Sequence, residues 1–239
     1  MEEKSDHPTA ANHRLRMLRI LMAHAIDLGW RDTDPTHGVK RQRHKAVGYA
    51  TWSEDEIAAY EARWPSGSRE RLAFALLLYT GQRRSDVVRM GWPQVRNEAI
   101  DLKQVKTGTA LAIPIHPDLA TELTFTPRDQ PTFLQRQNGA AFTANGFYMR
   151  FIGWCEKAGI PQGRSPHGLR KAAARRLAEA GCTAHQIAAI TGHRSLSEVE
   201  RYTKAADQVR LATAAMARIT RSKLQTPKEK LQTEDENGG

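Results

Sequence analysis

The stretch Ser165-Pro166-His167-Gly168-Leu169-Arg170 begins a predicted helix that carries the most informative side chains of this chain. A serine side chain can accept hydrogen bonds from the free N–H groups of a first turn, and proline suits the first helical position because it lacks an N–H. His167 and Arg170 are three residues apart, so they lie on one face of the helix. The stretch therefore predicts an imidazole and a guanidinium together at a helix N-terminus, where the helix dipole attracts phosphate.

Four more motifs flank this helix start. Downstream lie Thr191-Gly192-His193-Arg194 and Arg201-Tyr202. Upstream lie Thr80-Gly81-Gln82-Arg83-Arg84-Ser85-Asp86 and Lys106-Thr107-Gly108. Each motif alone has little weight, because a lone arginine is usually a surface residue and Lys-Thr-Gly is a common β-turn. Their combination is more informative, because it supplies every group that metal-free phosphodiester cleavage requires.

Such a cleavage requires a nucleophile, cations that neutralise the non-bridging oxygens, and a proton donor for the leaving oxygen. Tyr202 is the candidate nucleophile; a free phenol has a pKa of about 10, so neighbouring cations or a base must help to remove its proton. Arg83 and Arg170 can each bind phosphate oxygens through two hydrogen bonds, which lysine cannot do. Lys106, on a mobile hairpin, is the candidate general acid for the departing 5′ oxygen.

Two histidines complete the candidate site. His167 lies in the first turn of its helix, where the dipole disfavours imidazolium, so the neutral ring can act as a base. His193 is expected to supply a further hydrogen bond to the phosphate. No Cys, Asp or Glu lies at ligand spacing near these histidines, so neither a metal site nor a cofactor is expected.

In order and spacing, these motifs resemble the tyrosine recombinase family, particularly phage-type integrases, from about Thr51 to Ile219. The resemblance implies an α+β, mostly α fold: a catalytic domain with a small antiparallel β-sheet or hairpin. It implies a tetramer on paired sites in double-stranded DNA, a 3′-phosphotyrosyl intermediate with release of a 5′-OH, and DNA-bending accessory proteins as further partners. It also implies that Asp86 supports the first arginine.

The resemblance divides the chain into three parts. Residues 47–222 correspond to the catalytic domain, and residues 1–46 to a remnant of a helical core-binding domain with a basic linker. Residues 223–239 are charged and poor in apolar side chains, which predicts a disordered tail. Because such enzymes carry a whole core-binding domain, the site-specific recombinase expected here is truncated at that domain. The residues expected to bind DNA phosphates are Lys40, Arg41, Arg43, Lys45 and Arg84.

Hydrophobic periodicity and capping residues predict a series of helices. Between residues 99 and 115, alternating apolar residues predict a small hairpin or three-stranded sheet with Lys106 at its turn. The predicted helices cover residues 12–28, 54–64, 68–79, 85–90, 143–158, 166–180 and 184–190, a capped segment that leads to Tyr202, and residues 207–219.

Composition agrees with a DNA partner. A formal net charge of +10 and a pI near 9.9 favour a polyanion. The two cysteines, Cys155 and Cys182, lack the spacing of a disulfide framework or a zinc site. The first residues do not resemble a secretion signal, and charges interrupt the apolar stretch from Leu15 to Ile26, so a cytoplasmic protein without a membrane span is expected.

Two other functions remain open from the sequence. Residues 173–191 have a helix-turn-helix pattern, which predicts a sequence-specific DNA-binding regulator. The second helix of that pattern has few outward polar side chains at its start, and a regulator has no use for Tyr202 or Lys106. The other alternative is a catalytically weak integrase remnant that only binds DNA.

Overall fold

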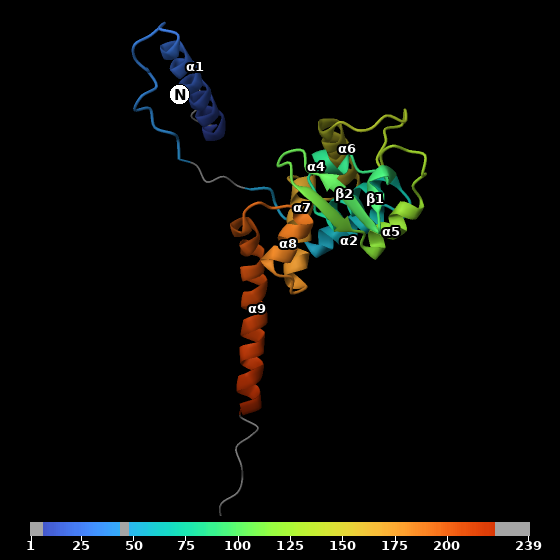
Figure 1. Ribbon diagram of the computed structural model, residues 1–239. Helices are drawn as coiled ribbons and strands as arrows, with labels where there is room; N and C mark the ends of the chain where they lie inside the picture. Colours follow the sequence, from blue (N-terminus) through green and yellow to red (C-terminus); the bar gives the residue numbers. More distant parts are fainter. Residues whose placement is uncertain (1–6, 44–47, 223–239) are drawn as a thin grey trace, which may run out of the picture. The chain divides into compact units, whose positions relative to one another are not determined.

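The computed structural model describes residues 7–43 and 48–222, and the chain divides into two compact units, residues 1–48 and residues 49–239 (Figure 1). The first unit consists of helix α1 (Pro8–Asp27) and the segment that follows it. α1 begins four residues before the expected start, because proline tolerates the first turn and alanine favours a helix. The following segment folds back along α1, since the Asn12 amide donates to and accepts from the backbone of Gln42, at 2.9 Å each.

The second unit has the predicted α+β, mostly α fold. Its elements in chain order are α2 (Glu54–Arg63), α3 (Arg69–Thr80), α4 (Arg84–Val87), η2 (Trp92–Gln94), β1 (Val95–Arg96), β2 (Ala99–Lys103), β3 (Ala110–Pro114), α5 (Pro117–Thr124), α6 (Ala144–Lys157), α7 (Pro166–Glu179), α8 (Ala184–Thr191) and α9 (Leu196–Ser222).

Helix α3 is the centre of the core of this unit. Most of its side chains are buried, and it contacts both α5 and α7. Phe74 of α3 stacks on Tyr60 of α2 with 4.6 Å between the ring centroids, and Trp52 packs against both rings. Gly81 then ends α3 in the left-handed conformation, with φ of 61°. The core therefore fixes the C-terminal end of α3 beside α7.

The sheet is antiparallel with strand order β1-β2-β3. Ile100 pairs with Ile113 across β2 and β3, and both side chains are buried. The sequence predicted β2, β3 and the turn between them. It did not place β1, because a strand of two residues has no hydrophobic alternation to detect.

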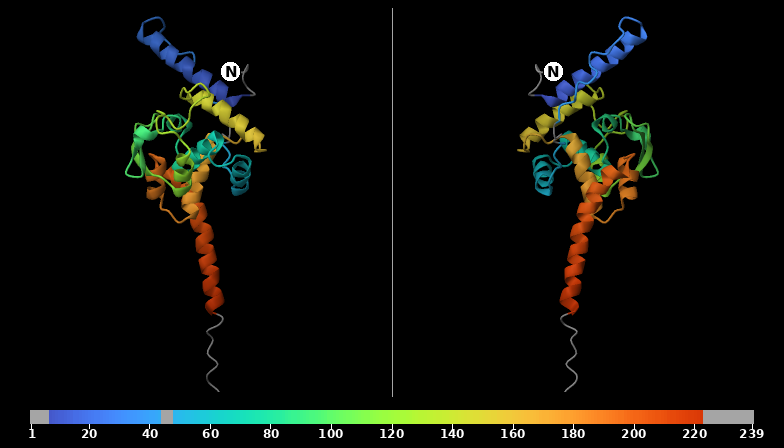
Figure 2. Two further views of the ribbon diagram at one scale, coloured as in Figure 1. Left: turned by 90° about the vertical axis from the view of Figure 1, so that its right-hand side faces the viewer. Right: turned by 90° about the vertical axis from the view of Figure 1, so that its left-hand side faces the viewer.

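Besides α1, two further predicted helices differ in extent from the structure. α4 ends at Val87 rather than at residue 90, because the N–H groups of Arg89 and Met90 bond to carbonyls three residues back, at 3.1 and 3.2 Å, which is the spacing of a turn rather than of an α-helix. α9 is one continuous helix where two elements were expected (Figure 2). No glycine or proline interrupts residues 196–222, so the acidic residue Asp207 does not mark a new helix start.

Candidate active site

Helix α7 begins as the sequence predicted. Ser165 is the N-cap, and its hydroxyl accepts a hydrogen bond from Gly168 N–H at 3.4 Å. The buried Trp52 indole donates to the Ser165 carbonyl at 3.1 Å, which fixes this helix start to the core. Arg170 is buried, whereas His167 remains partly exposed to solvent.

Gly168→Ala is expected to destabilise the protein by about 1–3 kcal/mol. A Cβ at this position would lie 2.3 Å from the backbone oxygen of Ala50 and 2.9 Å from Trp52 Cδ1, and neither atom can move freely. Gly153→Ala in α6 is the matched control, because its Cβ would meet nothing within 4 Å. That variant should gain roughly 0.5–1 kcal/mol from helix propensity. Denaturant unfolding of both variants tests this difference, and equal stabilities would contradict it.

Arg170 presents one occupied and one unoccupied side of its guanidinium. Nη1 donates to the carbonyls of Gly81 and Thr191, at 2.7 and 2.6 Å. Nη2 is buried and has no hydrogen-bond partner within the described residues. Burial lowers the pKa of Arg170 to about 10, and the charge of Arg83 acts in the same direction. A buried charged donor without a partner marks the place where an anion would bind.

Arg83 lies two residues after Gly81, the residue that ends α3. It is the N-cap residue of α4, and its Nη1 donates to Gln104 Oε1 at 3.2 Å. Arg84, for which a DNA contact is predicted, lies against α6 in the structure. Its guanidinium carbon lies 5.0 Å from the ring centroid of Tyr148.

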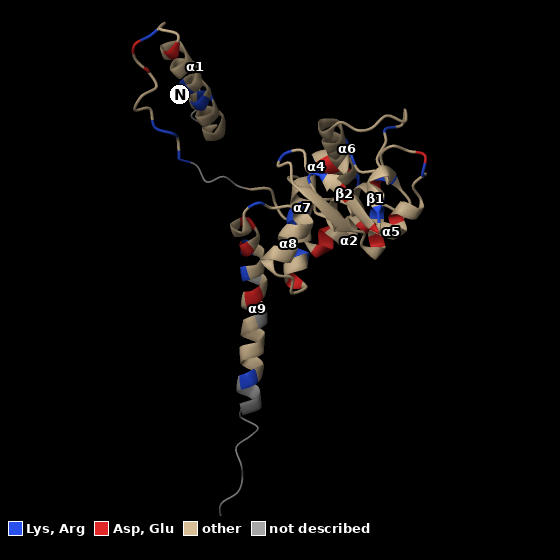
Figure 3. Ribbon diagram, in the orientation of Figure 1, with Lys and Arg blue, Asp and Glu red and all other residues tan. Residues whose placement is uncertain are grey.

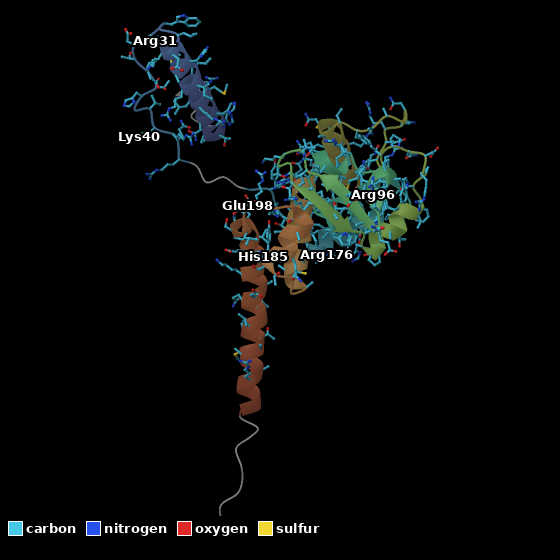
Figure 4. All side chains as sticks on the ribbon, in the orientation of Figure 1. Arg31, Lys40, Arg96, Arg176, His185 and Glu198 are labelled. Atoms are coloured by element: carbon cyan, nitrogen blue, oxygen red, sulfur yellow. The ribbon has the colours of Figure 1, made fainter. Side chains whose placement is uncertain are left out.

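Both predicted histidines lie within electrostatic range of the two arginines. Burial lowers the pKa of His193 to about 4, assisted by the charges of Arg170, Arg83 and His167. His193 Nδ1 lies 2.6 Å from Thr191 Oγ1. Its Nε2 lies 3.9 Å from a carboxylate oxygen of Glu198, which Figure 4 labels at the start of α9. Partial burial also lowers the pKa of His167, and so do the positive charges of Arg170, Lys171, Arg83 and Lys106. Both rings are therefore neutral at pH 7.

The lowered pKa of His193 predicts a pH dependence of stability. The unfolded state binds the His193 proton more tightly than the folded state does. The contribution of the neutral ring to the free energy of unfolding is therefore complete above the unfolded pKa, and it is lost as the pH falls toward about 4. We expect the free energy of unfolding of wild type to fall, relative to His193→Gln, by about 2 kcal/mol between about pH 7 and 5. Denaturant unfolding of both proteins at each pH measures this; parallel curves would contradict a neutral buried ring.

Lys106 lies at the turn between β2 and β3, where its side chain is exposed. Three hydrogen bonds hold this turn in the structure, and the mobility expected of it stays a prediction. Asp86 Oδ1 accepts from Val105 N–H at 2.8 Å, Arg194 donates to the Thr107 carbonyl at 2.6 Å, and Thr107 Oγ1 donates to Gln104 at 2.6 Å. Asp86 therefore contacts the lysine-bearing turn, and the support of Arg83 that the resemblance implies for it stays a prediction.

Tyr202 lies in the second turn of α9, where its ring packs against a small cluster of apolar side chains from α7, α8 and α9. Burial raises the pKa of its phenol, while the charges of Arg201 and Arg170 oppose that shift. Tyr202 also contributes to the electrostatic environment of Arg170. The structure thus brings the nucleophile candidate into range of the buried guanidinium, with the phenol protonated at neutral pH.

The basic linker belongs to the first unit. Lys40, Arg41 and Arg43 are exposed there. Figure 3 colours the Lys and Arg positions of the chain blue, and Figure 4 labels Lys40. Lys45 and the predicted tail, residues 223–239, lie outside the described residues. Within residues 7–43 and 48–222, no group of three or more His, Cys, Asp or Glu side chains could hold a metal ion. None of the helices described there is long and apolar enough to cross a membrane.

Comparison with known proteins identifies the family. The model of the phage integrase family matches residues 54–209, which is more than half of the chain. The chain belongs to this family. Its members are tyrosine recombinases, so the chain is an enzyme of DNA breakage and rejoining. The interpretation of residues 173–191 as the helix-turn-helix of a DNA-binding regulator is therefore set aside.

Several phage integrase relatives agree with this assignment. Tyrosine recombinase XerD of Lacticaseibacillus casei is 26% identical over 217 residues, covering 84% of this chain and 74% of the relative. The integrase of Escherichia phage HK022 is 32% identical over 91 residues, covering 38% of this chain and 26% of the relative. A lambda integrase dimer bound to a COC′ core site has a similar fold, with a TM-score of 0.72 at 22% identity over 84% of this chain and 75% of that chain. A lambda integrase tetramer bound to a Holliday junction has a TM-score of 0.71 at 21% identity, over 82% of this chain and 62% of that chain.

The sequence did not predict the neutral polar side chains that hold the arginines of the candidate site in place. Gln82 and Gln104 are both buried between the arginines and α8. Gln82 lies in the motif of residues 80–86, next to Arg83, and Gln104 lies two residues before Lys106. A glutamine next to a strand end or a helix end gave no signal that it would be buried, because glutamine is usually exposed.

Proposed function

We propose that this enzyme is a site-specific recombinase or integrase that cuts and rejoins DNA through a 3′-phosphotyrosyl intermediate formed by Tyr202. The observation that supports it best is the unpaired, buried Nη2 of Arg170, which lies in electrostatic range of Arg83, His167, His193 and Tyr202. This is a positive, partly dehydrated site next to a phenol. A single DNA phosphate fits its charge.

The proposed reaction begins with the scissile phosphate bound between Arg83 and Arg170. Their charges neutralise the non-bridging oxygens as the phosphorus becomes five-coordinate. The phenol oxygen of Tyr202 attacks the phosphorus, and the neutral His167 ring accepts its proton. His193 donates a hydrogen bond to a phosphate oxygen. The 5′ oxygen leaves with a proton from Lys106, and a 5′ hydroxyl later reverses these steps to rejoin the DNA.

Covalent trapping tests this proposal. The substrate is a duplex with a randomised core and a nick beside each cleavable bond, so that the released short strand diffuses away and religation stops. Wild-type protein should form a protein–DNA adduct that survives denaturation, and sequencing of the captured DNA should reveal the preferred core. DNA retention without any adduct would favour the remaining alternative, a remnant that only binds DNA.

Lys106→Ala tests the proposed general acid. Cleavage of the normal substrate should slow by about 10²–10⁴-fold, the usual contribution of general acid catalysis. A substrate whose bridging 5′ oxygen is replaced by sulfur has a leaving group that needs no proton, so Lys106→Ala should cleave it at nearly the wild-type rate. Single-turnover adduct formation measures both rates. A variant that is equally slow on both substrates would assign Lys106 another role.

The proposed partners are double-stranded DNA and further copies of this chain. Lys40, Arg41, Arg43, Lys45 and Arg84 are proposed to contact DNA phosphates. A tetramer on paired sites is supported by the lambda integrase tetramer on a Holliday junction, which has a similar fold. The exposed apolar side chains of Val209 and Met216, which are seven residues apart and so lie on one face of α9, offer a surface for a second copy. DNA-bending accessory proteins and a cytoplasmic site of action complete the proposal.

We also propose the domain division given by the resemblance: residues 1–46 as a core-binding remnant with its linker, 47–222 as the catalytic domain and 223–239 as a charged tail. The compact unit that begins at residue 49 supports the first boundary.

A further inference from the structure

The side-chain amide of Gln104 has a hydrogen-bond partner at each of its four main positions. The residue is buried, 1% exposed, between β2 and the turn that carries Lys106. Its Oε1 accepts from Arg83 Nη1 at 3.2 Å and from Thr107 Oγ1 at 2.6 Å. Its Nε2 donates to Gln82 Oε1 at 2.6 Å and to the Thr191 carbonyl at 2.9 Å.

Two of these partners fix the orientation of the amide. Arg83 can only donate, so it faces the oxygen, and the Thr191 carbonyl can only accept, so it faces the nitrogen. Gln82 agrees with this orientation, because its own Nε2 donates to the Ile190 carbonyl at 2.8 Å and leaves its oxygen toward Gln104. The amide cannot turn over without losing hydrogen bonds on both sides.

Each partner leads to a different group of the proposed active site. Thr107 follows Lys106 directly, and Arg83 is one of the two phosphate-binding arginines. The Thr191 carbonyl also accepts from Arg170 Nη1 at 2.6 Å. Gly192, which precedes His193, leaves room for the amide: a Cβ there would lie 2.4 Å from Gln104 Nε2, on a backbone with φ of 70°. The Gln104 amide thus bonds to Arg83, to the carbonyl that also holds Arg170, and to the threonine that follows Lys106. It also lies close to the glycine that precedes His193.

We infer that Gln104 is a positioning residue that sets the Lys106 turn relative to the two arginines, so that the general acid and the phosphate site form one unit. The inference rests on the proposed function of Lys106, Arg83 and Arg170. The lysine side chain itself is exposed, so the turn beneath it must define where its amine can reach. An error of about 1 Å in the position of a catalytic group can reduce a rate by on the order of 10²-fold.

A merely structural role for Gln104 makes a different prediction. If the amide only stabilises the fold, its loss slows cleavage of every substrate by the same factor. If it positions Lys106, its loss matters most when the leaving oxygen needs a proton. The ratio of the cleavage rate with a sulfur leaving atom to the rate with an oxygen leaving atom therefore separates the two roles.

The experiment measures this ratio for wild type, Lys106→Ala, Gln104→Leu and Thr107→Val by single-turnover adduct formation. Lys106→Ala should raise the ratio most. Thr107→Val, which removes the hydroxyl that donates to Gln104 and accepts from Thr109 Oγ1, should raise it about 10-fold with little loss on the sulfur substrate. Gln104→Leu should raise it similarly and also slow the sulfur substrate, because Arg83 loses its acceptor. Thr107→Ser, which restores the hydroxyl, should return the ratio to the wild-type value.

Each outcome has a defined meaning. A raised ratio in Lys106→Ala, with wild-type ratios in both Gln104→Leu and Thr107→Val, would overturn the role of Gln104 and leave the proposed function intact. An unchanged ratio in Lys106→Ala would remove the general acid, and the inference with it. If thermal melting shows that Gln104→Leu does not fold, Thr107→Val decides, because it alters a partly exposed turn residue.

Discussion

Tyr202→Phe is expected to abolish the covalent protein–DNA adduct completely and to leave folding and DNA binding unchanged. The phenylalanine ring keeps the apolar contacts with α7, α8 and α9, so the packing around this position is preserved. The variant lacks only the oxygen that would attack phosphorus. The measurement is adduct formation on the nicked duplex, together with a binding assay and a thermal melt.

Tyr49→Phe is the matched control for this experiment. Tyr49 is exposed, and its ring lies 4.7 Å from that of His167, so its hydroxyl is a second phenol close to the candidate site. The substitution keeps the ring contact and removes the oxygen, and adduct formation should continue at nearly the wild-type rate. An adduct that persists in Tyr202→Phe and disappears in Tyr49→Phe would reassign the nucleophile to Tyr49.

The starts of several helices could be predicted, because the residues that cap a helix are close to it in the sequence. Ser53, Ser165 and Thr183 each cap the helix that the sequence assigned to them. A cap needs only a side-chain oxygen and a free N–H two or three residues later, which a sequence displays directly. α5 was missed for the opposite reason, since it is short and its N-cap is a histidine, His116, which is an uncommon capping residue.

The supports of the candidate site could not be predicted, because they join residues that are distant in the chain. Gln104 bonds to Thr191, 87 residues away, and Arg170 bonds to Gly81, 89 residues away. Both bonds end on backbone carbonyls, which every residue carries and which therefore leave no trace in the sequence. The charged residues could be proposed from their motifs, whereas the neutral groups that orient them can be identified only in the folded structure.

The electrostatics of the site explain why these supports are needed. Arg83 and Arg170 carry like charges close enough to lower the pKa of Arg170, so their proximity costs free energy in the absence of an anion. The bonds from Arg170 to Gly81 and Thr191, and from Arg83 to Gln104, offset part of that repulsion. A bound phosphate would relieve the rest. The repulsion therefore favours phosphate binding over the empty site.

Arg170→Lys tests this account and should reduce the rate of adduct formation by about 10²–10³-fold, the usual effect of removing one donor to a developing charge. A single ammonium can replace Nη1 in its bonds to the carbonyls of Gly81 and Thr191, but it then has no second arm for the phosphate. The charge is retained, so the variant should fold. Single-turnover trapping and a thermal melt measure the two effects.

Arg170→Met is the companion variant, because it removes the charge and leaves the Gly81 carbonyl without its donor, while the Thr191 carbonyl keeps only its bond from Gln104. Each buried unsatisfied group costs about 1–3 kcal/mol, so this variant should melt well below Arg170→Lys. The pair separates the two sides of the guanidinium: lysine should preserve stability and lose cleavage, whereas methionine should lose both. Cleavage by Arg170→Lys within a few-fold of wild type would mean that the buried Nη2 does not bind the phosphate, since a lysine that keeps the two carbonyl bonds cannot supply that contact.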